Sequence, residues 1–78
     1  MEDVYQVRRT NLRGLLRELA CEGVSGIDAQ AALLIIRGTA LKGMLDSDPI
    51  SHLFARNVEW TMQRRYGWMD EDHREDPF

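Results

Sequence analysis

Residues 27–45 have the sequence IDAQAALLIIRGTALKGML, and the rest of the chain is predicted to pack around them. Asp28 precedes an apolar run, where it is placed to cap the free backbone N–H groups of a helix over residues 29–37. Gly38 then allows a turn, because glycine adopts a positive φ at little steric cost. Thr39 can cap a second helix beyond that turn. Two helices joined by a short turn with a glycine form the helix-turn-helix pattern.

Two further helices are predicted on either side of this pair. Between residues 8 and 22, apolar residues at spacings of three and four mark one helical face, formed by Leu12, Leu15, Leu16, Leu19 and Ala20. A second face, over residues 50–63, is formed by Ile50, Leu53, Phe54, Val58 and Met62, with Trp60 on its flank. With the helices at 29–37 and 39–46, these faces predict an all-α fold, a compact bundle of four to five helices without a sheet.

The segments between these helices carry boundary signals. Residues 1–7 show no periodicity and are expected to form an irregular arm or a frayed first turn. Ser47 or Asp48 is expected to cap the last helix, with Pro49 in its first turn. The helix over 29–37 is apolar nearly all round, which places it at the centre of the bundle.

The size of the chain limits what it can hold. A chain of 78 residues forms one domain with one modest core, and small helical domains often gain stability by pairing, so a homodimer is expected. Cys21 is the only cysteine, which excludes an intramolecular disulfide and a thiolate metal cluster and predicts a reduced, partly buried thiol. The apolar run at 29–36 is too short to span a bilayer, and residues 1–6 are acidic where a signal peptide is basic. We therefore expect a cytoplasmic protein with no membrane partner.

The charge is unevenly distributed along the chain. The formal net charge is −3, but residues 70–78 carry −4, so residues 1–69 carry +1. This composition predicts a helix-turn-helix domain over 1–69 and an acidic, disordered tail over 70–78. Trp68 follows a glycine that ends the last helix and precedes this tail, so it is predicted to be largely buried. A weakly basic folded part is compatible with DNA binding without requiring it.

Four arginines recur along the first predicted helix, and their role stays open. They could form a positive strip for nucleic-acid phosphates, or a solvated face on which some of them pair with nearby acidic residues. The four are Arg8, Arg9, Arg13 and Arg17.

No catalytic constellation can be assembled from the sequence. The two histidines, His52 and His73, lie on a predicted helix surface and in the tail, and Cys21 has no neighbouring base that would activate its thiol. The glycines form no phosphate-binding loop. We expect a protein that is not an enzyme, binds no small-molecule substrate and needs no cofactor or metal.

Three short segments follow one another in a suggestive order: QAAL at 30–33, FARNVE at 54–59 and GWMD at 67–70. In this order, over about residues 8–70, the chain resembles small phage-type repressors of the Cro and C1 class, including prophage and plasmid relatives. The resemblance implies an all-helical, lambda-repressor-like domain that binds operator DNA as a dimer and represses transcription.

The resemblance also implies site residues. Gln30 would touch a phosphate, and the groove-facing side of the second helix would present Thr39, Ala40, Lys42 and Gly43. The leading hypothesis is a Cro-like regulator of double-stranded DNA, with Thr39 and Lys42 at bases and phosphates held by Arg8, Arg9, Arg37 and Gln30. The alternatives for Gln30 and Lys42, ordinary surface side chains, stay open.

A second hypothesis is a protein-binding module on the same scaffold that has lost contact with DNA. Such a module would use an exposed apolar face around Trp60, Trp68 or Met44. The acidic net charge, the apolar recognition helix and the short segment between Gly38 and Ile50 favour it, whereas the order of the three motifs favours DNA binding. Asp46 and Asp48 at the far end of that helix would repel phosphates. If the domain binds DNA, deletion of the acidic tail is predicted to strengthen non-specific binding.

Overall fold

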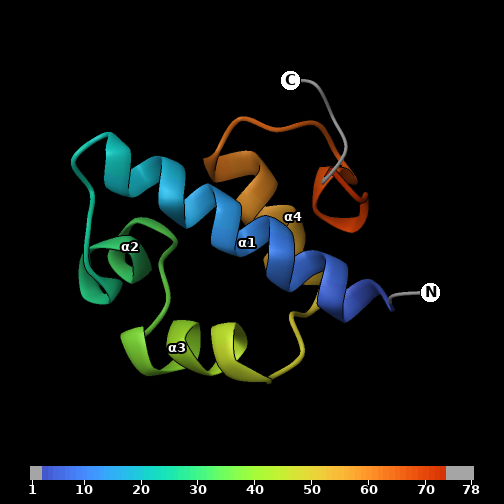
Figure 1. Cartoon of the computed structure of the whole chain (residues 1–78), viewed down its shortest axis with the longest axis horizontal. Coiled ribbons are helices and arrows are strands. Elements are labelled where there is room, and N and C mark those ends of the chain that lie inside the picture. The colour runs from blue at the N-terminus through green and yellow to red at the C-terminus, as the bar shows by residue number, and fades with distance from the viewer. Residues whose placement is uncertain (1–2, 74–78) are drawn as a thin grey trace.

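The computed structural model describes residues 3–73, and this part of the chain contains four α-helices, a short 3₁₀ helix and no strand. The helices are α1 (Val4–Cys21), α2 (Ile27–Leu33), α3 (Gly38–Asp46) and α4 (His52–Thr61), followed by the 3₁₀ helix η1 (Trp68–Asp70). In Figure 1, α1 runs across the molecule, with α2 and α3 on one side of it and the C-terminal turn packed near its N-terminal half. The all-α prediction is confirmed. Among residues 3–73, no helix combines the length and apolar content needed to cross a bilayer.

The first helix starts earlier than the sequence predicted. Asp3 caps α1, since its carboxylate accepts a hydrogen bond from the Gln6 backbone N–H at 2.9 Å. The irregular arm predicted for residues 1–7 is therefore wrong from Asp3 onward, because a capping aspartate can begin a helix without apolar periodicity. The predicted apolar face of α1 is buried as expected at Leu12, Leu15, Leu16 and Leu19, whereas Ala20 and Cys21 are exposed.

The turn between α2 and α3 falls at a different residue from the one predicted. α2 ends at Leu33, and Ile35 adopts the positive φ, 59°, that we expected at Gly38. Two backbone hydrogen bonds close this Schellman-type end, from Ile36 N to Ala31 O at 3.0 Å and from Ile35 N to Ala32 O at 3.2 Å. α2 also lies less centrally than predicted, because Leu33 is 43% exposed.

Gly38 serves close packing instead. It is the first residue of α3, and a Cβ atom there would lie 2.5 Å from Asp28 Oδ1, so any other residue would require the Asp28 carboxylate to move. Asp28 lies in the first turn of α2, whose N-cap is Gly26, and α3 is preceded by Arg37 without a side-chain cap. The predicted capping roles of Asp28 and Thr39 are therefore wrong.

The fourth helix begins two residues late. Ser51 caps α4, its hydroxyl accepting from the Phe54 N–H at 3.1 Å, so the predicted caps at Ser47 or Asp48 and the helical position of Pro49 are wrong. Leu53 was assigned to the core, but it is 81% exposed. The other members of the predicted stripe pack inward: Ile50, Phe54 and Val58 fully, and Met62 in part.

The C-terminal turn folds back onto the core, as predicted, but with a different anchor. Gly67 has φ 89° and reverses the chain, and Met69 is completely buried. Trp68 is only partly buried, so the prediction that it would be the buried anchor is wrong. Its ring stacks on His73 with the ring centroids 4.2 Å apart.

α4 ends like α2, and this end supports a stability prediction. Gln63 has φ 57°, a conformation that costs a residue with a Cβ about 1–2 kcal/mol. Gln63→Gly removes that strain, but glycine loses more conformational entropy on folding, which costs about 0.5–1 kcal/mol. We expect a net gain of up to about 1 kcal/mol in the free energy of unfolding by urea. Gln63→Ala, which keeps the Cβ, should give no gain and is the control.

Candidate nucleic-acid interface

The exposed side of α3 is the surface on which a helix-turn-helix would meet DNA. Leu41 is completely buried, and this fixes the rotation of α3 about its axis. Thr39, Ala40 and Lys42 are consequently exposed, as is Arg37 just before the helix. Four of the predicted site residues are thus accessible at the N-terminal half of α3.

Arginines of α1 hold the other end of α3. Arg9 donates from Nε to Met44 O at 2.9 Å and from a terminal nitrogen to Asp48 O at 3.3 Å, and Arg13 donates to Leu45 O at 2.6 Å. The last carbonyls of a helix lack partners within it and carry partial negative charge, so cations stabilise this end. Arg9, predicted at a phosphate, is partly buried and used for this contact.

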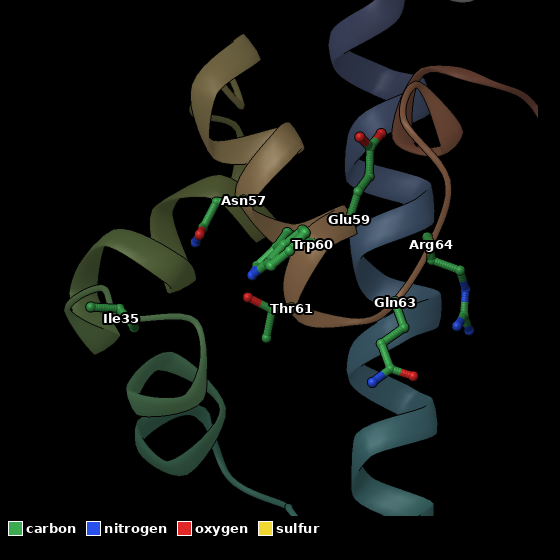
Figure 2. A pocket seen from close by; sticks show the side chains of 7 residues that line it. All are labelled: Ile35, Asn57, Glu59, Trp60, Thr61, Gln63 and Arg64. Carbon is green, nitrogen blue, oxygen red and sulfur yellow. The ribbon is translucent and has the colours of Figure 1, made fainter.

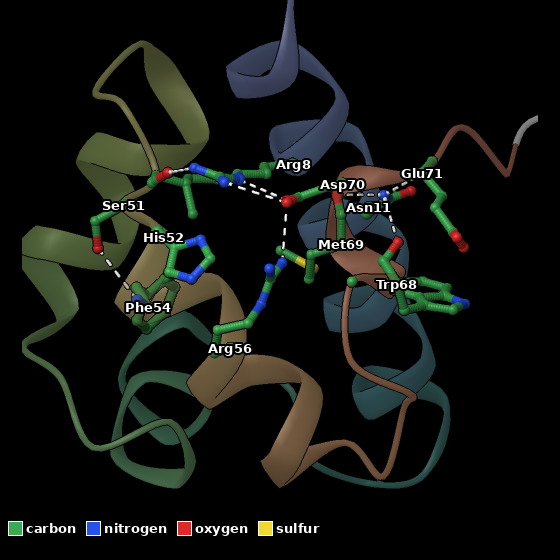
Figure 3. Close-up of polar contacts among 12 residues, drawn as sticks. Arg8, Asn11, Ser51, His52, Phe54, Arg56, Trp68, Met69, Asp70 and Glu71 are labelled. Atoms are coloured by element: carbon green, nitrogen blue, oxygen red, sulfur yellow. Dashed lines mark hydrogen bonds and ion pairs between the residues drawn. The ribbon is translucent and has the colours of Figure 1, made fainter.

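Arg8 lies inside the protein. It is 6% exposed, and its guanidinium donates to Ile50 O at 2.7 Å and pairs with Asp70, with Nε 2.6 Å from Oδ1 (Figure 3). A phosphate would have to displace Asp70 to reach it. Although it was predicted to contact DNA, Arg8 therefore stabilises the fold in this structure.

Gln30 is also inside. It is 7% exposed, and its amide nitrogen donates to Leu16 O and to Val24 O, each at 3.0 Å. Both carbonyls lie at or beyond the C-terminal half of α1, so Gln30 ties α2 to that segment. The amide that the resemblance assigns to a phosphate is engaged by these carbonyls.

Carboxylates border the exposed face of α3. Asp28 lies against Gly38 at its N-terminus, and the Asp48 carboxylate lies so close to Gly43 that a Cβ atom there would require it to move. Gly43, another predicted site residue, is thereby partly covered. Together with Asp46, three carboxylates therefore border α3. The basic side chains beside them are Lys42 on α3 and Arg37 just before it.

A cluster of four charged side chains joins α1, α4 and η1, and sequence reasoning missed it. Asp70 Oδ1 lies 2.6 Å from Arg8 and 3.1 Å from Arg56 (Figure 3). Arg56 in turn lies 2.8 Å from Glu59. The hydrogen bond from Arg8 lowers the pKa of Asp70 against the opposing effect of burial, and Arg56 lowers it further. Only the spacing of Arg56 and Glu59, three residues apart on one helix, gave a signal in the sequence.

Glu59 and Asn11 fasten the C-terminal turn through its backbone. Glu59 is 2% exposed and accepts hydrogen bonds from the N–H groups of Met69 at 2.7 Å and Gly67 at 3.1 Å. Asn11 donates to Met69 O and Glu71 O, each at 2.8 Å. Asp70, which we had placed in the acidic tail, is therefore part of η1 and of this packed region. The part of the predicted tail at 74–78 lies outside the residues that the structure describes.

A hollow of about 780 Å³ opens between the α2–α3 turn and α4 (Figure 2). Trp60 lies at its centre, and Ile35 lies on the neighbouring turn. Its remaining lining is Asn57, Glu59, Thr61, Gln63 and Arg64. No group of three or more His, Cys, Asp or Glu side chains within residues 3–73 is arranged to hold a metal ion.

Comparison of the chain with known protein families, with curated proteins and with solved structures found no match.

Proposed function

We propose that the protein is a small helix-turn-helix regulator that binds double-stranded DNA through α3. The observation that carries the proposal is the exposure of Thr39, Ala40 and Lys42 on one side of a helix whose opposite side is anchored by Leu41. A helix of this kind can lie in the major groove, with its first residues at the base edges. Thr39 and Lys42 are suited to hydrogen bonding there, and Arg37 to a phosphate.

The carboxylates that border α3 set the expected strength of binding. Arg8, Arg9 and Gln30 are engaged within the protein, which leaves Arg37 and Lys42 as the basic groups of this face. Asp28 lies at the N-terminus of α3, where a helix offers its N–H groups and positive dipole end to a phosphate. We expect weak binding to a single DNA site, with an affinity that falls strongly as the salt concentration rises.

The test uses three variants with different expected effects. Lys42→Ala should weaken retention on duplex DNA several-fold and lower the salt dependence by about 0.9 in the slope of log K against log salt. Asp28→Asn should strengthen retention, because it removes a negative charge from the end of α3. Arg17→Ala removes a positive charge from α1, in a hollow beside Trp68 and His73, and is the matched control for Lys42→Ala.

The assay is a gel-shift titration of the full chain on a random-sequence duplex pool, followed by sequencing of the bound fraction. Enrichment of one sequence by the parent chain, lost in Lys42→Ala and kept in Arg17→Ala, is the expected result. Equal retention of all four proteins would contradict the role of α3.

A second candidate function is a protein-binding module on this scaffold. The specific observation in its favour is a set of large apolar side chains in water: Ile35, Leu53 and Trp60 are each more than four-fifths exposed. Absence of retention on duplex DNA by the parent chain and by Asp28→Asn, at low salt, would favour this candidate over DNA binding.

A further inference from the structure

Two residues with a strained backbone line the same hollow. Among residues 3–73, Ile35 at φ 59° and Gln63 at φ 57° are the non-glycine residues with a positive φ. Ile35 follows the end of α2 and Gln63 follows the end of α4, and both line the hollow of about 780 Å³ around Trp60 (Figure 2). Strained backbone of this kind gathers at ligand-binding sites, where the surrounding fold holds it in place. The strain therefore points to a ligand in this hollow.

The apolar part of the hollow suits a planar ring. Trp60 is 84% exposed, and Ile35 on the α2–α3 turn is 83% exposed. Leaving both side chains in water is unfavourable, so a ligand that covers them gains the free energy of their burial. An exposed indole beside an aliphatic side chain offers a flat apolar surface on which a second ring can stack. The volume also lies within the range of about 300–1,000 Å³ that is usual for small-molecule sites.

Neutral polar groups surround the indole. Asn57, Thr61 and Gln63 line the hollow with amide and hydroxyl groups, which can both donate and accept hydrogen bonds. Asn57 donates one amide N–H to Leu34 O at 3.2 Å, which leaves its carbonyl oxygen as an acceptor. A ring with alternating donors and acceptors along its edge fits this lining. Nucleobases have such an edge, and proteins bind unpaired bases by stacking on an aromatic side chain with hydrogen bonds to that edge.

The charged residues that line the hollow are already engaged. Glu59 pairs with Arg56 and accepts hydrogen bonds from the backbone of the C-terminal turn. Arg64 donates to Glu18 at 2.8 Å and to Met62 O at 3.0 Å. Neither residue offers an unpaired charge to a phosphate or to an ammonium group. The lining therefore favours an uncharged ligand, a nucleoside over a nucleotide.

We propose that this hollow binds the base of a free nucleoside, which stacks on Trp60 and is held at its edge by Asn57 and Gln63. The proposal does not depend on DNA binding by α3. No sequence pattern indicated the site, because Ile35 and Trp60 belong to separate segments that the fold brings together. We expect a dissociation constant on the order of 1 mM, since stacking on one ring is the main contact.

An NMR titration of the ¹⁵N-labelled full chain with adenosine, and separately with cytidine, tests the proposal. The indole N–H signal of Trp60 and the side-chain amide signals of Asn57 and Gln63 should shift and reach saturation. The indole signal of Trp68, which lies outside the lining, should stay in place. Shifts that never saturate with either nucleoside, or the absence of any shift, would overturn the proposal.

Two variants on α4 form a matched pair. Trp60→Ala should weaken adenosine binding about ten-fold or more, measured from the Asn57 signals. Leu53→Ala removes another exposed apolar side chain of the same helix, 81% exposed and not part of the lining, so it should bind adenosine like the parent chain. Equal binding by Trp60→Ala and the parent would refute the site.

Ile35→Gly separates binding from folding. It relieves the strained backbone and removes the aliphatic wall of the hollow, so its melting temperature should equal or exceed that of the parent while adenosine binding is weakened. A variant that is at least as stable as the parent and binds adenosine equally well would contradict the link between the strain and the ligand.

Two further ligands identify the source of the base. A free nucleoside as the ligand predicts equal binding of adenosine and adenosine monophosphate, without dependence on salt. Tighter, salt-dependent binding of a single-stranded adenine oligonucleotide, lost in Trp60→Ala, would keep a base in the hollow and assign it to a nucleic-acid strand. Trp60 signals that shift with protein concentration alone, and with no nucleoside, would assign the hollow to a second copy and overturn the proposal.

Discussion

Replacement of Glu59 by alanine is expected to cost about 3–5 kcal/mol in the free energy of unfolding, because it removes one member of a buried ion pair. Arg56 would lose a partner 2.8 Å away, and the Met69 and Gly67 N–H groups would lose their acceptor. A single core in a domain of this size rarely supplies more than about 3–5 kcal/mol, so much of the variant should be unfolded at room temperature. Urea denaturation followed by far-UV circular dichroism measures the loss.

Two controls define the origin of that effect. Glu59→Gln keeps the shape and one acceptor oxygen, and its loss should be intermediate. Glu18→Gln breaks the ion pair with Arg64, whose partners are 49% and 29% exposed at their side chains, and should cost less than about 1 kcal/mol. If Glu59→Ala and Glu18→Gln had the same urea midpoint, the C-terminal turn would not depend on Glu59.

The second large effect is expected at Asp70, where Asp70→Asn should cost about 1.5–3 kcal/mol, the range for hydrogen bonds to charged groups. Arg8 would then retain Ile50 O but lose its charged partner at 2.6 Å. The same ion pair affects the experiment in which the acidic tail is deleted. Deletion of residues 70–78 removes this carboxylate with the rest of the tail, so the loss of stability must be measured before any change in DNA binding is interpreted.

The lowered pKa of Asp70 also determines how the stability of the fold changes with pH. Because its pKa in the folded state lies below the ordinary value of 3.8, the ionised carboxylate stabilises the fold above that pH. This stabilisation is lost as the pH falls through the lowered pKa. Urea midpoints of the parent and of Asp70→Asn should therefore differ clearly at about pH 7 and converge on acidification below about pH 4. A constant difference across this range would contradict the ion pair.

The helical class and most of the core could be predicted from the pattern of apolar residues. Leu12, Leu15, Ile50 and Val58 were placed by a periodicity of three and four that one helix carries on its own. The helix-turn-helix order and the exposed position of Lys42 followed from the same local reasoning. Helix ends were less predictable. The caps are Asp3 and Ser51, not the residues predicted, and Ile35 adopts the positive φ that is usual for glycine.

The roles of the charged and amide side chains could not be predicted in this way, because they depend on contacts between distant segments. Arg8 and Asp70 are 62 residues apart in sequence, and nothing near either residue indicates that they meet. Gln30 and Arg9 looked like groups for phosphates, but the packing of α1 against α2 and α3 brings backbone carbonyls within 3.0 Å of them. A buried carbonyl without a donor is costly, so the nearest long polar side chain satisfies it. Helical periodicity is a local property that one segment carries, whereas the partner of a long polar side chain depends on which other segments the fold brings beside it.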